Sequence, residues 1–242
     1  MAYINFRILG YITTLLIHST NLIYMKYTSR QVNIEDTDVK FFKSMEYRYF
    51  TTWTVILQIF YAFYGVTCDI LILKNSKKKN FKLPDITTQI REILFAGLVW
   101  PCSWVVFTVF WTIFKYDRSL VFPEFLDQII TSYSNHIIHT AIIPIVLWEV
   151  VFRPREEPIS HARNIAQLTM HMSMYVCVLF FTHFETGIWL YPFFAVYYGT
   201  IHFVLIFVYI GLLCLFFYYL QWYINRLIHG NIEKVEVKTK ER

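Results

Sequence analysis

Two histidines and their polar neighbours interrupt an apolar stretch between about residues 132 and 151. Asn135, His136, His139 and Thr140 occur there within six residues. At helical spacing, His136, His139 and Thr140 share one face, and Asn135 lies one turn before His139. Ionisable side chains in membrane-embedded segments are costly and usually face a cavity or a bundle interior. This face is therefore a candidate functional site.

A threonine near a second apolar stretch offers a nucleophile for one of these histidines. Thr51 lies near the start of the stretch at about 49–73. A threonine hydroxyl becomes an effective nucleophile when a neutral imidazole takes its proton. With six spans, the helices that carry Thr51 and His139 run in the same direction, which places both residues in the same half of the bilayer. The alternative is that these polar residues only form hydrogen bonds between membrane helices.

A metal site is a rival interpretation of the histidines. His136 and His139 could bind one ion together, with His171 or His183 as a third ligand. The carboxylates of the apolar stretches lie toward the opposite side of the membrane, and the sequence has no H-E-x-x-H motif. We therefore predict that the protein uses no metal and no other cofactor.

The composition indicates an integral membrane protein. Hydrophobic residues make up 56% of the chain and charged residues 16%, whereas a soluble domain has about 25% charged residues. The apolar residues form long blocks, and the alternating segments of a β-barrel are absent. The net charge of +5 comes from short loops and a tail beside apolar blocks, where membrane topology and anionic lipids explain it. Membrane lipids, and not nucleic acid, are the expected partners.

Six apolar stretches have the length of about 20 residues that a transmembrane helix needs. The sequence therefore predicts an all-α polytopic membrane protein, with six helices in one bundle and a single domain over residues 1–242. Prolines in the third and fourth stretches, Pro101 and Pro144, predict kinks. The predicted spans cover about 5–25, 49–73, 93–114, 132–151, 166–184 and 194–224, followed by a short basic tail at 225–242.

The distribution of lysine and arginine predicts the orientation. These residues are in excess on the side that carries both termini and the loops at 74–92 and 152–165, which favours two cytosolic termini. Lys238 and Lys240 are the fifth-last and third-last residues of the chain. That spacing resembles the dilysine retrieval signal of endoplasmic-reticulum membrane proteins, which predicts this compartment. The alternative for the tail is an ordinary basic solvated segment. Residence at the plasma membrane, in addition to the endoplasmic reticulum, is also compatible with the sequence.

A set of motifs between about Tyr47 and Phe193 resembles one known family, the androgen-induced gene one and androgen-dependent tissue-factor-pathway-inhibitor-regulating proteins. The glycine-containing motif at its end also has the character of an interfacial turn with aromatic anchors. In order, the matching residues are Phe110-Trp111, Tyr116-Asp117-Arg118, Pro123, Leu126-Asp127, Asn135-His136-x-x-His139-Thr140, Pro144, Glu149 and Thr186-Gly187-x-Trp189-x-Tyr191-Pro192-Phe193.

The resemblance implies an activity and a substrate. Members of that family are six-span proteins resembling threonine hydrolases, which cleave fatty acid esters of hydroxy fatty acids. Carried over by position, the nucleophile falls on Thr51 and the histidine on His139. The implied substrate is a lipid ester that enters from the bilayer. Asn135 and His136 are candidates, by proximity, for support of the pair or for stabilising the oxyanion.

A non-enzymatic protein is the alternative function, either a lipid-binding regulator or a small membrane carrier. A carrier would need polar residues across both halves of the bilayer. In the fourth stretch they stop after Thr140 and resume only at Glu149, which favours a one-sided pocket. The distance from Thr51 to His139 separates these interpretations, because a base must lie within hydrogen-bond reach of its nucleophile or one water away.

Overall fold

The computed structural model describes residues 3–32, 36–78 and 81–230 of the chain. Every regular element in these ranges is helical. The α-helices are α1 (Ile4–Gln31), α2 (Thr37–Met45), α3 (Phe50–Lys74), α4 (Asp85–Leu94), α5 (Trp100–Tyr116), α6 (Ser132–His139), α7 (Ile142–Phe152), α8 (Ala162–Thr186), α9 (Pro192–Tyr197) and α10 (Ile201–His229). Short turns of helix occur at Glu46–Arg48, Phe95–Val99, Arg118–Leu120 and Glu124–Gln128.

Six helical units are long and apolar enough to cross a membrane: Ile4–Gln31, Phe50–Lys74, Asp85–Tyr116, Ser132–Phe152, Ala162–Thr186 and Ile201–His229. The shortest has 21 residues, or about 32 Å at 1.5 Å per residue, which matches a hydrocarbon core of about 30 Å. The prediction of an all-α, six-span membrane protein is therefore confirmed.

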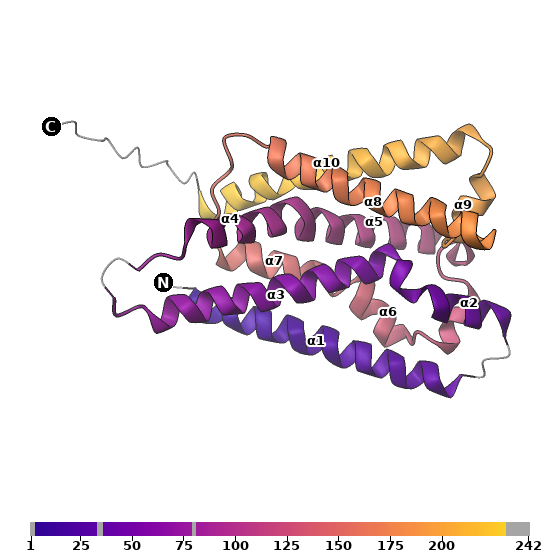
Figure 1. Ribbon diagram of the computed structural model, residues 1–242, viewed down its shortest axis with the longest axis horizontal. Helices are drawn as coiled ribbons and strands as arrows, with labels where there is room; N and C mark the ends of the chain where they lie inside the picture. Colours follow the sequence, from indigo (N-terminus) through magenta and orange to yellow (C-terminus); the bar gives the residue numbers. More distant parts are fainter. Residues whose placement is uncertain (1–2, 33–35, 79–80, 231–242) are drawn as a thin grey trace.

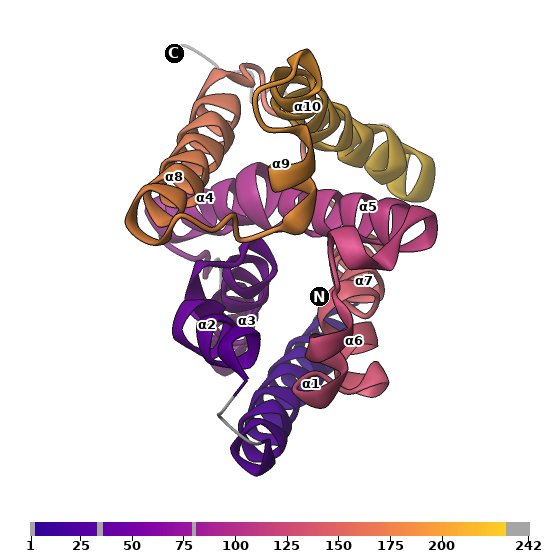
Figure 2. The same ribbon diagram turned by 90° about the vertical axis from the view of Figure 1, so that its right-hand side faces the viewer.

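The helices form one elongated bundle (Figure 1). α1 packs along α3, and α10 packs against α5. Viewed from the end, α5 lies between the α1–α3 side and the α8–α10 side (Figure 2). The start of α1 and the end of α10 lie at the same end of the bundle, whereas α3 begins at the opposite end (Figure 1). That opposite end also carries α2, α6 and α9.

Two spans begin seven or eight residues from their predicted starts. The third begins with α4 at Asp85 instead of about 93, because the polar sequence of α4 hides its helical character from hydropathy. The sixth begins at Ile201 instead of about 194. There Pro192–Tyr197 forms the separate helix α9, and Gly199 follows it with a φ of +79°. That left-handed conformation favours glycine and ends a helix.

The predicted tail differs from the structure at its start. α10 continues to His229, so the first residues of the predicted tail at 225–242 are helical. The two lysines of the dilysine pattern, Lys238 and Lys240, lie outside the described residues.

Proline interrupts the third and fourth spans as its chemistry requires. The turn Phe95–Val99, which ends two residues before Pro101, is π-helical, and the Trp100 N–H donates to the Phe95 carbonyl. The fourth span breaks between α6 and α7, where the N–H groups of Thr140 and Ala141 both donate to the His136 carbonyl. A proline has no N–H for the helical ladder, so the chain finds other partners near it.

A glutamine from a neighbouring helix fixes this break. The Gln58 side chain on α3 is fully buried and donates to the Ile142 carbonyl at 3.0 Å and to the Ser103 hydroxyl at 2.8 Å. Its own oxygen lies 2.8 Å from His18 Nε2 on α1. Gln58 therefore connects α1, α3, α5 and α7, and it holds the end of the segment that carries His139.

Buried ion pairs close the end of the bundle where α1 begins. Asp69 is fully buried and pairs with Arg7 and Arg91, each at 2.8 Å. Glu149 accepts from the Tyr11 hydroxyl at 2.5 Å and pairs with Arg153 at 3.1 Å. A buried charge is tolerated when it is paired and hydrogen-bonded, and here arginines both pair with Asp69 and donate hydrogen bonds to it, whereas Glu149 has an arginine and a tyrosine as partners.

Candidate active site

The first turn of α3 presents Thr51. Phe50 is the first residue of the helix and Thr51 the second. Of the three threonines in this turn, Thr52 donates to the Glu46 carbonyl at 2.8 Å and Thr54 to the Phe50 carbonyl at 3.0 Å. Their hydroxyls are therefore engaged with the backbone, whereas the Thr51 hydroxyl faces α6.

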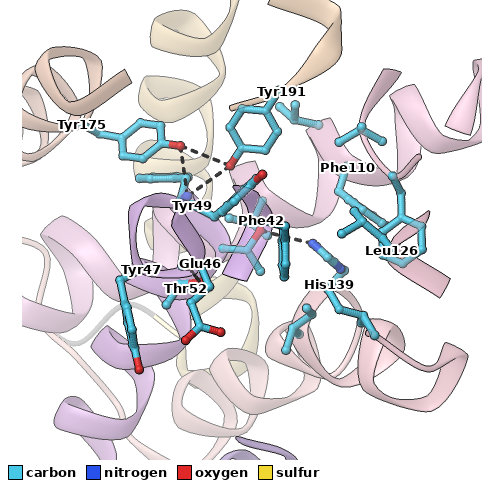
Figure 3. A pocket seen from close by; sticks show the side chains of 18 of the residues that line it. Phe42, Glu46, Tyr47, Tyr49, Thr52, Phe110, Leu126, His139, Tyr175 and Tyr191 are labelled. Carbon is cyan, nitrogen blue, oxygen red and sulfur yellow. Dashed lines mark hydrogen bonds between the residues drawn. The ribbon is translucent and has the colours of Figure 1, made fainter. Parts of the chain in front are cut away.

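The hydroxyl of Thr51 on α3 contacts the imidazole of His139 on α6. Thr51 Oγ1 lies 3.2 Å from His139 Nε2. His139 is the last residue of α6, and its side chain faces the cavity shown in Figure 3. The two residues are separated by 88 positions in the sequence. The structure therefore brings the predicted nucleophile and base within the hydrogen-bond distance that proton transfer needs.

Asn135 determines which ring nitrogen of His139 carries the proton. His139 Nδ1 lies 2.8 Å from the Asn135 side-chain oxygen and 3.1 Å from the Asn135 backbone carbonyl. A carbonyl oxygen can only accept, so Nδ1 must donate and hold the proton. Nε2 then has a free lone pair toward Thr51. Asn135 lies behind the histidine as its orienting partner, and not beside Thr51.

His136 lies away from this pair. Its side chain is exposed, stacks on Trp111 with ring centroids 5.1 Å apart, and places Nδ1 3.1 Å from the Thr140 hydroxyl. His136 is not among the residues that line the cavity. The structure therefore brings Asn135, but not His136, into contact with His139.

The rival metal ligands are also separated. Among the residues that the structure describes, no group of three or more histidine, cysteine or carboxylate side chains is placed to hold a metal ion. His183 stacks on Trp189 with ring centroids 4.0 Å apart, and His171 packs beside Trp53 at 5.6 Å. Each histidine therefore has an aromatic neighbour in its own part of the bundle.

Thr51 and His139 line a cavity of about 310 Å³. Its walls are mostly apolar, and they come from two sides of the bundle. One set of walls comes from α1, α2 and the turns before α6, and the other comes from α8, α9 and α10. The main apolar residues are Met25, Phe42, Phe122, Leu126 and Ile129 on the first side, and Leu179, Phe194, Phe207 and Ile210 on the second. Such a cavity suits a molecule with hydrocarbon on both sides of a polar centre.

Two tyrosines that the sequence did not single out as functional complete the site. The N–H of Phe50 donates to Tyr175 Oη at 3.0 Å and to Tyr191 Oη at 3.1 Å. Both tyrosines line the cavity (Figure 3). From sequence alone, the motif around Tyr191 indicates only an interfacial turn. Its contact with α3 joins residues 141 positions apart, which local spacing does not reveal.

Fold and site together define a multi-pass helical membrane protein with a threonine–histidine pair at an apolar cavity. The chain belongs to the family described as FAR-17a/AIG1-like protein, whose model matches residues 13–226. The family resemblance noted in the sequence is thereby confirmed.

Several curated proteins are similar to this chain. Androgen-dependent TFPI-regulating protein from Homo sapiens is 40% identical over 150 residues, which cover 62% of this chain and 63% of that protein. The same-named protein from Rattus norvegicus is 35% identical over 76% of this chain and 79% of its own length. Androgen-induced gene 1 protein from Homo sapiens is 32% identical over 43% of each chain.

The similarity to the human androgen-dependent TFPI-regulating protein thus spans less than two thirds of that relative's length. No solved structure matches the chain.

Proposed function

We propose that the protein is an intramembrane threonine-type hydrolase that cleaves fatty acid esters of hydroxy fatty acids. The observation that carries this proposal is the 3.2 Å contact between Thr51 Oγ1 and His139 Nε2 at the wall of a largely apolar cavity. A hydroxyl with a correctly oriented base is the arrangement for nucleophilic acyl transfer. The cavity supports a lipid ester as the acyl donor.

Acylation begins with proton transfer from Thr51 to His139. As Nε2 takes the hydroxyl proton, Thr51 Oγ1 forms a bond to the ester carbonyl carbon, and the carbonyl oxygen becomes negatively charged. When this tetrahedral intermediate collapses, the bond from that carbon to the ester oxygen breaks. His139 returns its proton to the departing hydroxy fatty acid. The acyl chain is then held on Thr51 as an ester.

Deacylation repeats these steps with water. His139 Nε2 takes a proton from a water molecule, whose oxygen attacks the acyl carbon, and Thr51 recovers its proton when its bond to that carbon breaks. The products are a fatty acid and a hydroxy fatty acid. Throughout, Asn135 accepts from Nδ1, which favours the positive charge that the imidazole carries in each intermediate.

We further propose that both termini face the cytosol and that the protein resides in the endoplasmic reticulum. The start of α1 and the end of α10 lie at one end of the bundle (Figure 1), consistent with an even number of spans. This orientation places Thr51 and His139 in the half of the membrane away from the cytosol. The excess of basic residues on the side of the termini supports it.

The test is the release of free fatty acid from branched esters of hydroxy fatty acids by membranes that contain the wild-type chain. Thr51→Ala and His139→Ala should abolish release at equal expression. Thr54→Val is the matched control, because the Thr54 hydroxyl donates to the Phe50 carbonyl of its own helix, and it should retain activity. If wild-type membranes release no more than empty membranes across several ester isomers, the alternative of a non-enzymatic lipid-binding regulator or carrier replaces the proposal.

A further inference from the structure

Two tyrosine hydroxyls meet at the start of α3. Tyr175 comes from α8 and Tyr191 from the turn before α9. Both accept from the Phe50 N–H, and their own oxygens lie 3.2 Å apart. Figure 3 shows these tyrosines on one side of the cavity and His139 on another. The phenol pair therefore contacts the residue directly before Thr51, and His139 contacts Thr51 itself.

Of the two phenol protons, only one takes part in the hydrogen bond between the tyrosines. Each hydroxyl carries one proton, and a single bond joins the two oxygens, so one proton has no acceptor among the described side chains. Tyr175 is the more deeply buried of the two, at 6% exposure, and its hydroxyl donates to Tyr191. The free proton is then on Tyr191, which is only partly buried and lines the cavity.

The environment keeps Tyr191 in its neutral form. Burial raises the pKa of the Tyr191 phenol above its usual value, although the bonds from Tyr175 and from the Phe50 N–H act in the opposite direction. Tyr191 therefore holds its proton at physiological pH and can donate it in a hydrogen bond. The Phe50 N–H and the Tyr175 hydroxyl polarise the same oxygen, and such chains of hydrogen bonds strengthen one another.

Acyl transfer to Thr51 needs a donor of this kind. The carbonyl oxygen gains negative charge as Thr51 Oγ1 bonds to the carbon, and the largest catalytic effects come from donors already placed where that charge develops. The backbone N–H of Thr51 is a first-turn group with no acceptor inside the helix. It forms no hydrogen bond with any other described residue. It provides one donor, as the nucleophile's own N–H does in serine hydrolases, and a second is required.

We propose that the Tyr191 hydroxyl is this second oxyanion donor, with Tyr175 as the residue that positions it. The inference rests on the proposed hydrolase function. It assigns to Tyr191 a hydrogen bond to the former carbonyl oxygen in both tetrahedral intermediates, and no proton is transferred. When each intermediate collapses, the oxygen becomes a carbonyl again and the hydrogen bond weakens.

The experiment compares the wild type with Tyr191→Phe, Tyr175→Phe and Tyr218→Phe in membranes, using a long-chain ester and its thionoester, in which sulfur replaces the carbonyl oxygen. Tyr218 is a buried tyrosine of α10 whose hydroxyl bonds Asn164 and His161, outside the cavity lining, so its variant controls for loss of a buried hydroxyl. Retention of monomeric, folded protein is checked by size exclusion and thermal unfolding in detergent.

Tyr191→Phe should lower kcat for the oxoester by about 100-fold, the effect of losing one oxyanion donor, with little change in KM. The loss for the thionoester should be much smaller, because sulfur accepts hydrogen bonds poorly. Tyr175→Phe should lower kcat less than Tyr191→Phe does, because Tyr191 keeps its free proton in the Tyr175→Phe variant. Tyr218→Phe should keep the wild-type rates.

Three results would overturn the assignment and leave the hydrolase intact: wild-type kcat in Tyr191→Phe, equal losses for both substrates, or a greater loss in Tyr175→Phe. The Thr51→Ala variant distinguishes these results from failure of the proposed function. If the wild type is no more active than Thr51→Ala on any ester, the hydrolase proposal and the role of Tyr191 fall together.

Discussion

The imidazole of His139 lies flat against the phenyl ring of Phe110, with ring centroids 3.5 Å apart and an angle of 7° between the planes. Phe110 comes from α5, so a third helix fixes the plane of the imidazole. Asn135 fixes the Nδ1 edge of the same ring. Only the edge that carries Nε2 then remains directed at Thr51. The packing of one aromatic side chain thus preorganises the proposed proton transfer.

Asn135→Ala should lower kcat by about tenfold. The variant removes the closer of the two acceptors of Nδ1 and leaves the backbone carbonyl, and a factor of ten corresponds to about 1.4 kcal/mol, within the usual range for one hydrogen bond. His136→Ala is the matched control on the same helix and should remain active, because His136 lies outside the cavity lining. Ester hydrolysis by both variants checks this, and equal rates would contradict the orienting role of Asn135.

A larger side chain in the cavity should slow the hydrolysis of long-chain esters more than that of short-chain esters. Ile210 lines the cavity from α10, and Ile210→Trp should lower kcat/KM for long-chain esters by about tenfold relative to short-chain esters, because the larger ring takes space that the chain needs. Leu205→Trp, at an exposed position of the same helix, should leave the ratio unchanged. The measurement is hydrolysis of a homologous series of esters, and an equal loss at every chain length would rule out this use of the cavity.

Asp69→Asn should destabilise the bundle strongly. The substitution leaves Arg7 and Arg91 without their shared carboxylate in a buried position, and breaking such a pair costs about 3–5 kcal/mol. Glu185→Gln breaks the partly exposed pair with Arg48 and should cost less than about 1 kcal/mol. Thermal unfolding in detergent measures both, and similar midpoints for the two variants would show that the buried network contributes little.

Gly65→Ala should destabilise the contact between α3 and α1. A Cβ at Gly65 would lie 2.6 Å from the Tyr11 ring, and Tyr11 is fixed by its bond to Glu149. Overpacking of this kind costs about 1–3 kcal/mol. Gly211→Ala on α10 meets nothing within 4 Å and should be tolerated. Comparison of the two unfolding midpoints tests the prediction, which fails if Gly65→Ala is as stable as Gly211→Ala.

Hydropathy predicted the number of spans because long apolar blocks have few alternatives in a membrane. It missed the start of α4, whose polar residues are tolerated because Arg91 pairs with Asp69 on α3. It also merged α9 with α10, because both are apolar and only the backbone at Gly199 separates them. Pairing and backbone conformation depend on neighbours that a hydropathy window does not include.

The candidate site was predictable where the evidence is local or follows from the resemblance. The interval of four residues from Asn135 to His139 indicates that the two lie close together. It does not indicate whether the side-chain amide of Asn135 contacts His139 or Thr51. That choice depends on how α6 faces α3. The phenols of Tyr175 and Tyr191 meet through Phe50, far away in the sequence, so no spacing rule connects them.

Thr51 is the second residue of a membrane-crossing helix, which sets where the products of the proposed reaction appear. An ester cleaved at this depth releases its new carboxyl group at the boundary between hydrocarbon and water. A fatty acid that ionises there is strongly hydrated and does not easily return as a neutral acid to acylate Thr51. The position of the nucleophile along its helix thus gives the ionised product of the proposed reaction a short path to water, while the equilibrium is set by the reactants and products alone.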